Sequence, residues 1–203
     1  MTPRRALPLL LAAPALAARP ALARSGYRWR VMRQGSEIGS HTVEFARRGE
    51  DLVATSDVSV TPTVLGIVVY RFEHRYTEVT RAGRFVSVQS RLNRNGEVVE
   101  VEAEAGREAV RVRGPQGVLR LPPDAAPLSW WEPQRLGGAV PLFGTTTGTQ
   151  PELRWQREAL AGGGLRWRTS GEIEAVLEYD ASGRWVGYSV LGDDGSTVSY
   201  APA

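Results

Sequence analysis

The stretch Glu97-Val-Val-Glu-Val-Glu-Ala-Glu-Ala105 decides the fold class. Apolar residues occupy the odd positions from Val99 to Ala105, and glutamates alternate with them. This period of two predicts a β-strand with one face on a core and the other in water. Asn95-Gly96 stands directly before it, and both residues tolerate the positive φ that a type I′ hairpin turn requires. The sequence therefore predicts a hairpin at this point.

The same alternation recurs on both sides of this hairpin. Glu172 to Tyr179 repeats it, and near the start of the chain Tyr27, Trp29 and Val31 alternate with arginines. In the next segment the inward position changes from even at Ile38 to odd at Val43, which predicts a β-bulge at Gly39.

Turn residues interrupt these segments at hairpin spacing, and helical periodicity is nearly missing. The sequence predicts an all-β chain of roughly ten to twelve antiparallel strands. So many strands are expected to form one strongly curved antiparallel sheet, as a half-barrel or open barrel, because a flat sheet exposes its edges. A sandwich is the alternative.

One segment departs from the strand pattern. Leu121 to Gly148 is rich in proline and contains Trp130-Trp131 and a Gly-Thr-Thr-Thr-Gly turn. Its apolar side chains are unlike those of a flexible polar linker. We therefore expect a packed crossover within a single all-β domain that spans residues 24–203.

The charge balance points to a leader. All 25 cationic residues are arginine, against 22 acidic residues, and three of the arginines lie within residues 1–23. Residues 1–23 contain a basic start, an apolar run and an Ala-Leu-Ala cleavage site, which are typical of a signal peptide. Arg4-Arg5 favours a twin-arginine leader, and a general secretory leader is the alternative. The sequence thus predicts a periplasmic or secreted protein with no stable membrane anchor once the leader is removed.

Composition also excludes several classes of function. The chain has no cysteine, which rules out disulfides and cysteine ligands. Without the leader, 22 arginines balance 22 carboxylates, so no nucleic-acid partner is expected. His41 and His74 lack a metal-binding spacing, and no phosphate or dinucleotide motif occurs. No metal and no cofactor are therefore predicted, and Asp193-Asp194-Gly195-Ser196 is interpreted as a hairpin turn.

Several short segments, taken in order, resemble a family of exported bacterial proteins classed as a domain of unknown function. They are Tyr27-x-Trp-x-Val31, Gly35-x-x-Ile-Gly39, Tyr70-x-Phe-x-His74, Gly83-Arg-Phe-Val86, Ser129-Trp-Trp131-x-Pro133, Glu178-Tyr-Asp180 and Gly183-Arg-Trp-Val186. The resemblance implies a strongly curved antiparallel sheet. Carriers of lipid-like ligands are among the periplasmic proteins with such sheets, although a shared fold does not imply a shared function.

Five residues are candidates for binding a ligand: Tyr70, Phe72, His74, Trp130 and Trp131. Strand parity puts His74 on the inner face with Tyr70 and Phe72, where an imidazole could orient the polar end of a ligand. The alternative is a core histidine bonded to a hydroxyl or a carbonyl group. The two tryptophans could line the mouth of the sheet or plug one end of its core.

Other carboxylates fit the outer faces of strands. Glu100, Glu102 and Glu104 are expected to pair across strands with Arg111 and Arg113.

Three functions follow from these observations. The first is a non-enzymatic binder or carrier of an apolar or amphiphilic small molecule. The second is an envelope scaffold or accessory protein that binds another protein through a sheet edge or the crossover. The third is a hydrolase or isomerase that uses His74, for which the sequence names no second catalytic group.

Overall fold

The computed structural model describes residues 25–203 except 66 and 193. Within these residues one antiparallel sheet of thirteen strands dominates, in the order β10-β9-β8-β7-β6-β3-β2-β1-β17-β16-β15-β14-β13. The predicted curved, all-β antiparallel sheet is confirmed. The predicted leader, residues 1–23, lies outside the described residues.

The main-sheet strands are β1 (Tyr27–Arg33), β2 (Ser36–Arg48), β3 (Asp51–Val60), β6 (Phe72–Arg81), β7 (Arg84–Arg94), β8 (Glu97–Ala105), β9 (Val110–Gly114), β10 (Gly117–Leu121), β13 (Leu153–Ala159), β14 (Leu165–Gly171), β15 (Ala175–Tyr179), β16 (Trp185–Leu191) and β17 (Thr197–Pro202). The short elements are β4 (Thr63–Val64), β5 (Ile67–Val68), β11 (Ala126–Pro127), η1 (Pro133–Arg135), β12 (Leu142–Phe143) and η2 (Ala161–Gly163). The expected ten to twelve strands were too few, because strands of two residues, such as β4, β5, β11 and β12, carry no alternation to be recognised. Both helices are single 3-10 turns, so no helix in the described residues could cross a membrane.

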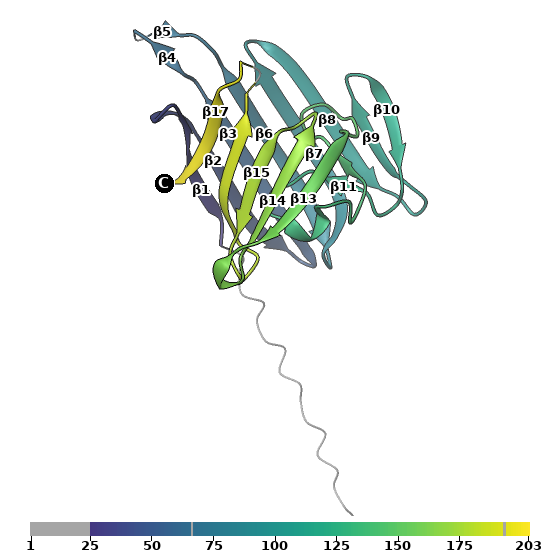
Figure 1. The fold of residues 1–203 in the computed structure, drawn as a ribbon. Coiled ribbons are helices and arrows are strands. Elements are labelled where there is room, and N and C mark those ends of the chain that lie inside the picture. The colour runs from purple at the N-terminus through teal and green to yellow at the C-terminus, as the bar shows by residue number, and fades with distance from the viewer. Residues whose placement is uncertain (1–24, 66, 193) are drawn as a thin grey trace, which may run out of the picture.

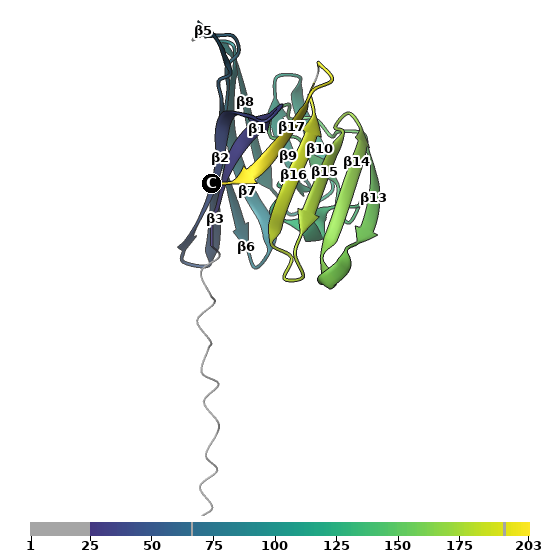
Figure 2. The same cartoon turned by 60° about the vertical axis from the view of Figure 1, so that its left-hand side comes forward.

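The sheet curls back over itself as two arms. The long arm contains β1 to β3 and β6 to β10, and the short arm contains β13 to β17. Pairing of β1 with β17 joins the arms and brings the two ends of the described chain together. Figure 1 shows the short arm in front of the long one, and Figure 2 shows the corner where they meet. The sheet ends at β10 and β13, so it is an open barrel rather than a sandwich of two separate sheets.

Turn and bulge chemistry follows the sequence. Asn95 and Gly96 have φ of 52° and 93° between β7 and β8, as a type I′ turn requires. The predicted bulge also forms, because Val31 faces Gly39 while Met32 faces Glu37, which leaves Ile38 as the extra residue.

The crossover fills the hollow between the arms, as expected for a packed segment. Parallel pairing of β11 with β12 organises it, and its buried side chains include Leu128, Trp131, Leu136 and Phe143. These join the same hydrophobic cluster as residues of both arms. The inner face of the curved sheet is therefore covered mainly by the chain's own segment 121–148.

Gly39 gives a test of the bulge. A Cβ atom there would lie 2.0 Å from the Ser59 carbonyl oxygen, a backbone atom that cannot move aside. We expect Gly39→Ala to lower the free energy of unfolding by about 1–3 kcal/mol, the usual cost of overpacking. Chemical denaturation measures this loss.

Gly187→Ala is the matched control, because the nearest atom to a Cβ there is a carboxylate oxygen of the Glu178 side chain at 3.1 Å rather than a backbone atom at 2.0 Å. It should leave stability unchanged or raise it slightly. Equal effects of the two substitutions would contradict the close approach at Gly39.

Candidate functional site

Three of the five predicted ligand residues lie in one line of aromatic rings, in which Phe72 meets His74 edge to face and the others stack. Phe72 and His74 point inward from β6, with ring centroids 6.2 Å apart. Tyr76, two residues further on, stacks on His74 at 5.0 Å and on Trp131 of the crossover at 5.6 Å. We call Phe72, His74, Tyr76 and Trp131 the ring line.

The other two predicted residues lie elsewhere. Trp130 turns toward the short arm, where its ring lies 5.5 Å from that of Tyr188 and its carbonyl oxygen accepts a 2.7 Å bond from the Tyr179 hydroxyl. Tyr70 precedes β6 and is half exposed, and it is not one of the stacked rings. The five residues therefore do not form one site.

His74 is a core histidine bonded to a hydroxyl group. Its Nε2 lies 2.9 Å from Ser90 Oγ, and Ser90 donates its single hydrogen to the Thr145 carbonyl at 2.7 Å. The imidazole must therefore donate to Ser90, so it does not act as a base toward that hydroxyl. Burial lowers the pKa of His74 to about 4, although a backbone hydrogen bond with Thr145 raises it in part. The geometry does not support a serine nucleophile activated by His74.

His41 has a similar environment on β2. Its Nε2 lies 2.9 Å from Ser56 Oγ, and Trp185 and Tyr200 pack against its ring. Its Nδ1 is buried and lacks a hydrogen-bond partner among the described residues. Burial lowers the pKa of His41 to about 3, and the charge of His74 makes a smaller contribution in the same direction. Both histidines are therefore neutral near pH 7.

Four polar side chains form a buried cluster beside the ring line. Glu78 on β6 accepts 2.6 Å bonds from Arg135 of η1 and from the Ser129 hydroxyl. The Tyr76 hydroxyl lies 3.4 Å from Ser129. Glu78 and Arg135 are both buried, with about 1% and 5% of their surface exposed. We call Tyr76, Glu78, Ser129 and Arg135 the buried polar cluster.

The charged contacts of this cluster act as a structural tie, which means that they hold the crossover on β6. Burial raises the pKa of Glu78, while the charge of Arg135 and the bonds from Ser129 and Arg135 oppose the rise. Ser129 donates its hydrogen to a carboxylate that an arginine already engages. The cluster thus fixes the crossover against β6. Within the described residues no three metal-ligating side chains converge.

The sequence carries a signal that Glu78 is buried. Glu78 has the inward parity of Phe72, His74 and Tyr76, unlike the carboxylates on the outer faces of the strands. An acidic residue in phase with an inward stripe predicts a buried partner, because an unpaired charge is not tolerated in a core. Arg135 could not be identified as that partner, because it lies in a segment without strand periodicity.

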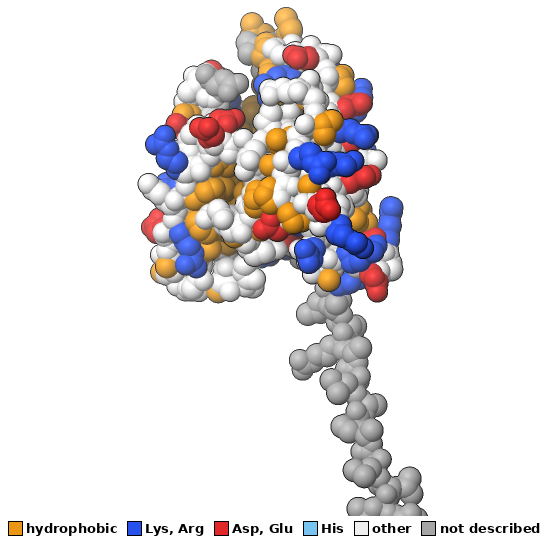
Figure 3. Space-filling model, turned by 90° about the vertical axis from the view of Figure 1, so that its right-hand side faces the viewer, with side chains coloured by type: hydrophobic (Ala, Val, Ile, Leu, Met, Phe, Trp, Pro, Cys, Tyr) orange, Lys and Arg blue, Asp and Glu red, His pale blue; other side chains and the backbone are white. Residues whose placement is uncertain are grey.

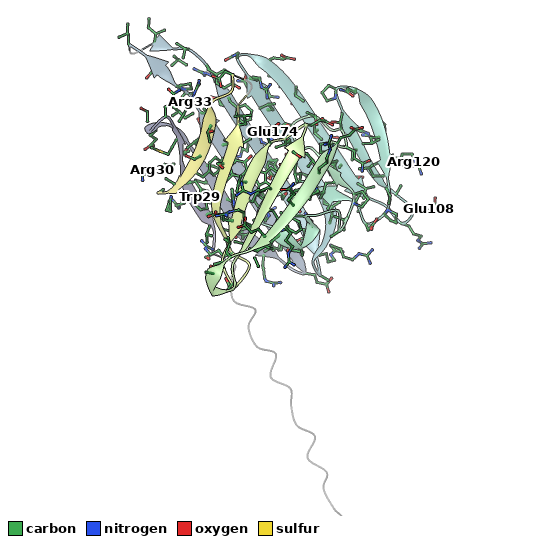
Figure 4. The ribbon with its side chains drawn as sticks, in the orientation of Figure 1. Trp29, Arg30, Arg33, Glu108, Arg120 and Glu174 are labelled. Atoms are coloured by element: carbon green, nitrogen blue, oxygen red, sulfur yellow. The ribbon has the colours of Figure 1, made fainter. Side chains whose placement is uncertain are left out.

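The ring line has little room for a ligand. Trp131 is about 1% exposed and joins the hydrophobic cluster, so the tryptophan plugs the core. Three hollows on the described surface, of about 320, 770 and 580 Å³, are lined mainly by turn and edge residues instead. Glu108 and Arg120 line the first of these, at the β9–β10 edge (Figure 4).

Apolar side chains remain partly uncovered on the open side of the barrel. Figure 3 shows this side, with hydrophobic side chains gathered in a recess between two lobes. The partly buried residues near the open edges are Leu119 on β10, Val140 in the crossover, Leu153 and Trp155 on β13 and Trp167 on β14. We call these five residues the recess.

The two tryptophans of the recess differ in their surroundings. Trp167 is held by the crossover, since a Cβ on Gly137 would lie only 2.3 Å from its ring. Trp155 packs edge to face on Trp167, with the centroids 5.8 Å apart, and lies on the last strand of the sheet. Arg157 has the same parity as Trp155 and pairs in register with Trp167, and it is exposed. A half-covered aromatic pair thus lies beside a cation.

The fold and these surroundings define an open, barrel-like β-domain. The family model described as domain of unknown function (DUF6134) matches residues 29–203, so the chain belongs to that family. No curated protein matches the chain. It is similar to the crystal structure of a beta-barrel-like protein of domain of unknown function DUF1849 from Brucella abortus, at 10% identity. That match covers 88% of this chain and 94% of the other with a TM-score of 0.57, and it shows the fold alone.

The buried polar cluster can be tested by removing one charge. Glu78→Gln removes the carboxylate that Arg135 bonds in the core, so we expect the free energy of unfolding to fall by about 3–5 kcal/mol. Arg135→Met should cost a similar amount, and the double variant should lose less than the sum of the two. Denaturant unfolding of the three variants completes the cycle.

Glu100→Gln is the control. The expected cross-strand facing holds for Glu102 with Arg113 and for Glu104 with Arg111. Glu100 instead pairs with Arg91 on β7, and both partners are more than half exposed. Loss of an exposed pair should cost less than about 1 kcal/mol. A similarly small loss for Glu78→Gln would show that the buried polar cluster is not a structural tie.

The histidines predict a pH dependence of stability. Their pKa values are lowered in the folded state, so below about pH 6.5 the unfolded chain takes up protons first. The contribution of the two neutral histidines to stability is therefore fully present above pH 6.5 and is lost as the pH falls toward about 4. Each histidine contributes at most about 1.4 kcal/mol per pH unit.

The variant His41→Gln/His74→Gln removes both histidines of the chain. Its stability should not fall between about pH 6.5 and 5, where ordinary carboxyl groups do not titrate. Glu78 acts in the opposite sense, because a raised pKa lets the folded state take up a proton first. Denaturation midpoints at several pH values measure the slope, and an unchanged slope in the variant would rule out the histidines as its source.

Proposed function

We propose that this chain is a non-enzymatic binder or carrier of an apolar or amphiphilic small molecule in the periplasm or outside the cell. The ligand lies in the recess rather than along the ring line. One observation carries this proposal. Trp155 and Trp167 remain partly uncovered at the open edge, while the crossover covers most of the inner face.

The chemistry of the recess favours an amphiphile. Each tryptophan can bury a large apolar area against a ligand chain. Arg157 is exposed on the Trp155 face of β13, where it is placed to pair with an anionic head group. Apolar walls with a few polar groups at one end are typical of small-molecule sites. By contrast, the two histidines are neutral and the Glu78 carboxylate is paired with Arg135, so these buried groups are not poised for hydrolysis.

Lauric acid is a suitable probe, because it combines a short apolar chain with a carboxylate. We expect it to quench tryptophan fluorescence and Trp155→Ala to weaken its affinity by about tenfold. Arg157→Gln should weaken lauric acid more than the corresponding alcohol, since only the acid carries a charge. Fluorescence titration and calorimetry measure both effects.

Gln156→Ala is the matched control, because this exposed residue has the opposite parity on the same strand. It should bind lauric acid as the unaltered chain does. Native mass spectrometry and organic extraction of protein purified from its producing cells would identify a natural ligand. A clean unliganded mass, together with equal titrations of all the variants, would refute the proposal.

A second candidate function is binding to another protein through a sheet edge. The sheet order ends at β10 and β13, so each of these strands has a sheet neighbour on one side only. An extended segment of a partner could add to such an edge. Crosslinking from β10 or β13 in cells distinguishes the two functions, because a reproducible protein partner without an extracted ligand favours this one.

A further inference from the structure

The hairpin between β3 and β6 carries aliphatic side chains that nothing in the described structure covers. We call residues 61–65 and 67–71 the tip hairpin; they include β4 and β5 and project beyond the body of the sheet (Figures 1 and 2). Leu65 is about 98% exposed and Ile67 about 69%, and Val68 and Val69 are about half exposed. Exposed aliphatic residues elsewhere are more scattered, whereas a contiguous set at one tip marks an interaction site.

Polarity changes in a fixed order along the tip hairpin. Residues 58–70 contain no charged side chain, and Tyr70 and then Arg71 follow the aliphatic run. Arg71 and Asn95 exchange hydrogen bonds of 2.8 and 2.9 Å, which brings Arg94 to the same base. Arg94 lies over the ring of Phe72, and Arg71 lies 3.7 Å from Glu73. The order of apolar tip, tyrosine and arginine matches the hydrocarbon, interface and phosphate layers of a lipid bilayer.

The exposed side chains point to both sides of the tip hairpin. Successive residues of a strand face opposite sides, and the neighbours Ile67 and Val68 are both exposed. A protein groove or a second copy of this chain would cover one side and leave the other in water. A fluid bilayer surrounds a narrow projection, so it covers both.

We propose that the tip hairpin inserts shallowly into a phospholipid bilayer, with Tyr70 at the interface and Arg71 and Arg94 beside lipid phosphates. The contact is reversible, because four short aliphatic side chains bury far less area than a membrane span does. Pairing of Thr63 with Val68 and of Val64 with Ile67 satisfies part of the backbone at the tip, as an apolar phase requires. This inference does not depend on the recess or its ligand.

The absence of cysteine from the chain allows a direct test. Leu65→Cys places a single thiol at the tip, to which an environment-sensitive fluorophore is attached in the full-length protein. Vesicles of phosphatidylcholine with phosphatidylglycerol should shift its emission to the blue and raise its intensity severalfold. Nitroxide groups on the lipid chains should quench it, while iodide in the water should not.

Val118→Cys is the matched control, because Val118 is about 64% exposed on β10 and lies away from the tip hairpin. Its label should not respond to vesicles. Ile67→Asp in the Leu65→Cys chain should weaken the vesicle response by about tenfold or more, since a charge replaces an aliphatic group that would lie in the lipid. Arg71→Gln/Arg94→Gln should reduce the difference between anionic and neutral vesicles.

Three results would overturn the proposal. The first is a label at residue 65 that stays accessible to iodide in the presence of vesicles. The second is a blue shift that grows with protein concentration and needs no lipid, which would identify a second copy of the chain as the occupant. The third is a response that Ile67→Asp leaves unchanged.

Discussion

The buried ion pair between Glu78 and Arg135 is the contact on which the arrangement of this molecule depends. A sheet that curls without closing leaves its inner face in need of cover, and segment 121–148 supplies that cover. Arg135 and Ser129 attach this segment to β6, and the Thr145 carbonyl attaches it to Ser90 on β7. These polar contacts set where Trp131 meets Tyr76, because apolar packing alone is not directional. A buried pair is a tie of this kind even where it adds little net stability.

Much of the fold follows from period-two alternation and turn chemistry. The strand at Glu97–Ala105, the type I′ turn at Asn95-Gly96 and the bulge beside Gly39 depend on neighbours in sequence, so local patterns predict them. The order of strands does not follow in the same way. Pairing of β1 with β17 joins residues about 170 positions apart, and no local pattern encodes it. Strands of only two residues are also missed, because they are too short to show a pattern.

The candidate site was harder to predict than the fold. Parity placed Phe72 and His74 on the inner face correctly, but parity does not say whether another segment covers that face. Trp131 and Tyr76 cover His74, which lies in a filled core, while Phe72 at the end of β6 is half-buried. Conversely, Trp155 and Trp167 alternate with polar residues as ordinary core positions do. Only their place on the last two strands of an open sheet leaves them partly uncovered.

The recess and the tip hairpin share one physical feature, which is exposed or partly exposed apolar side chains. Both surfaces keep apolar side chains that the rest of the chain leaves partly or wholly uncovered. A chain selected for stability alone could replace them with polar residues, because surface substitutions seldom change stability by more than about 0.5 kcal/mol. Leu65 stabilises nothing in the described structure, and Trp155 buries only part of its ring. Residues that contribute so little to folding and raise the risk of aggregation are best explained by a contact outside the chain. The tip hairpin and the recess belong to different strands, and the buried polar cluster holds the interior between them, so each surface can change without unfolding the other.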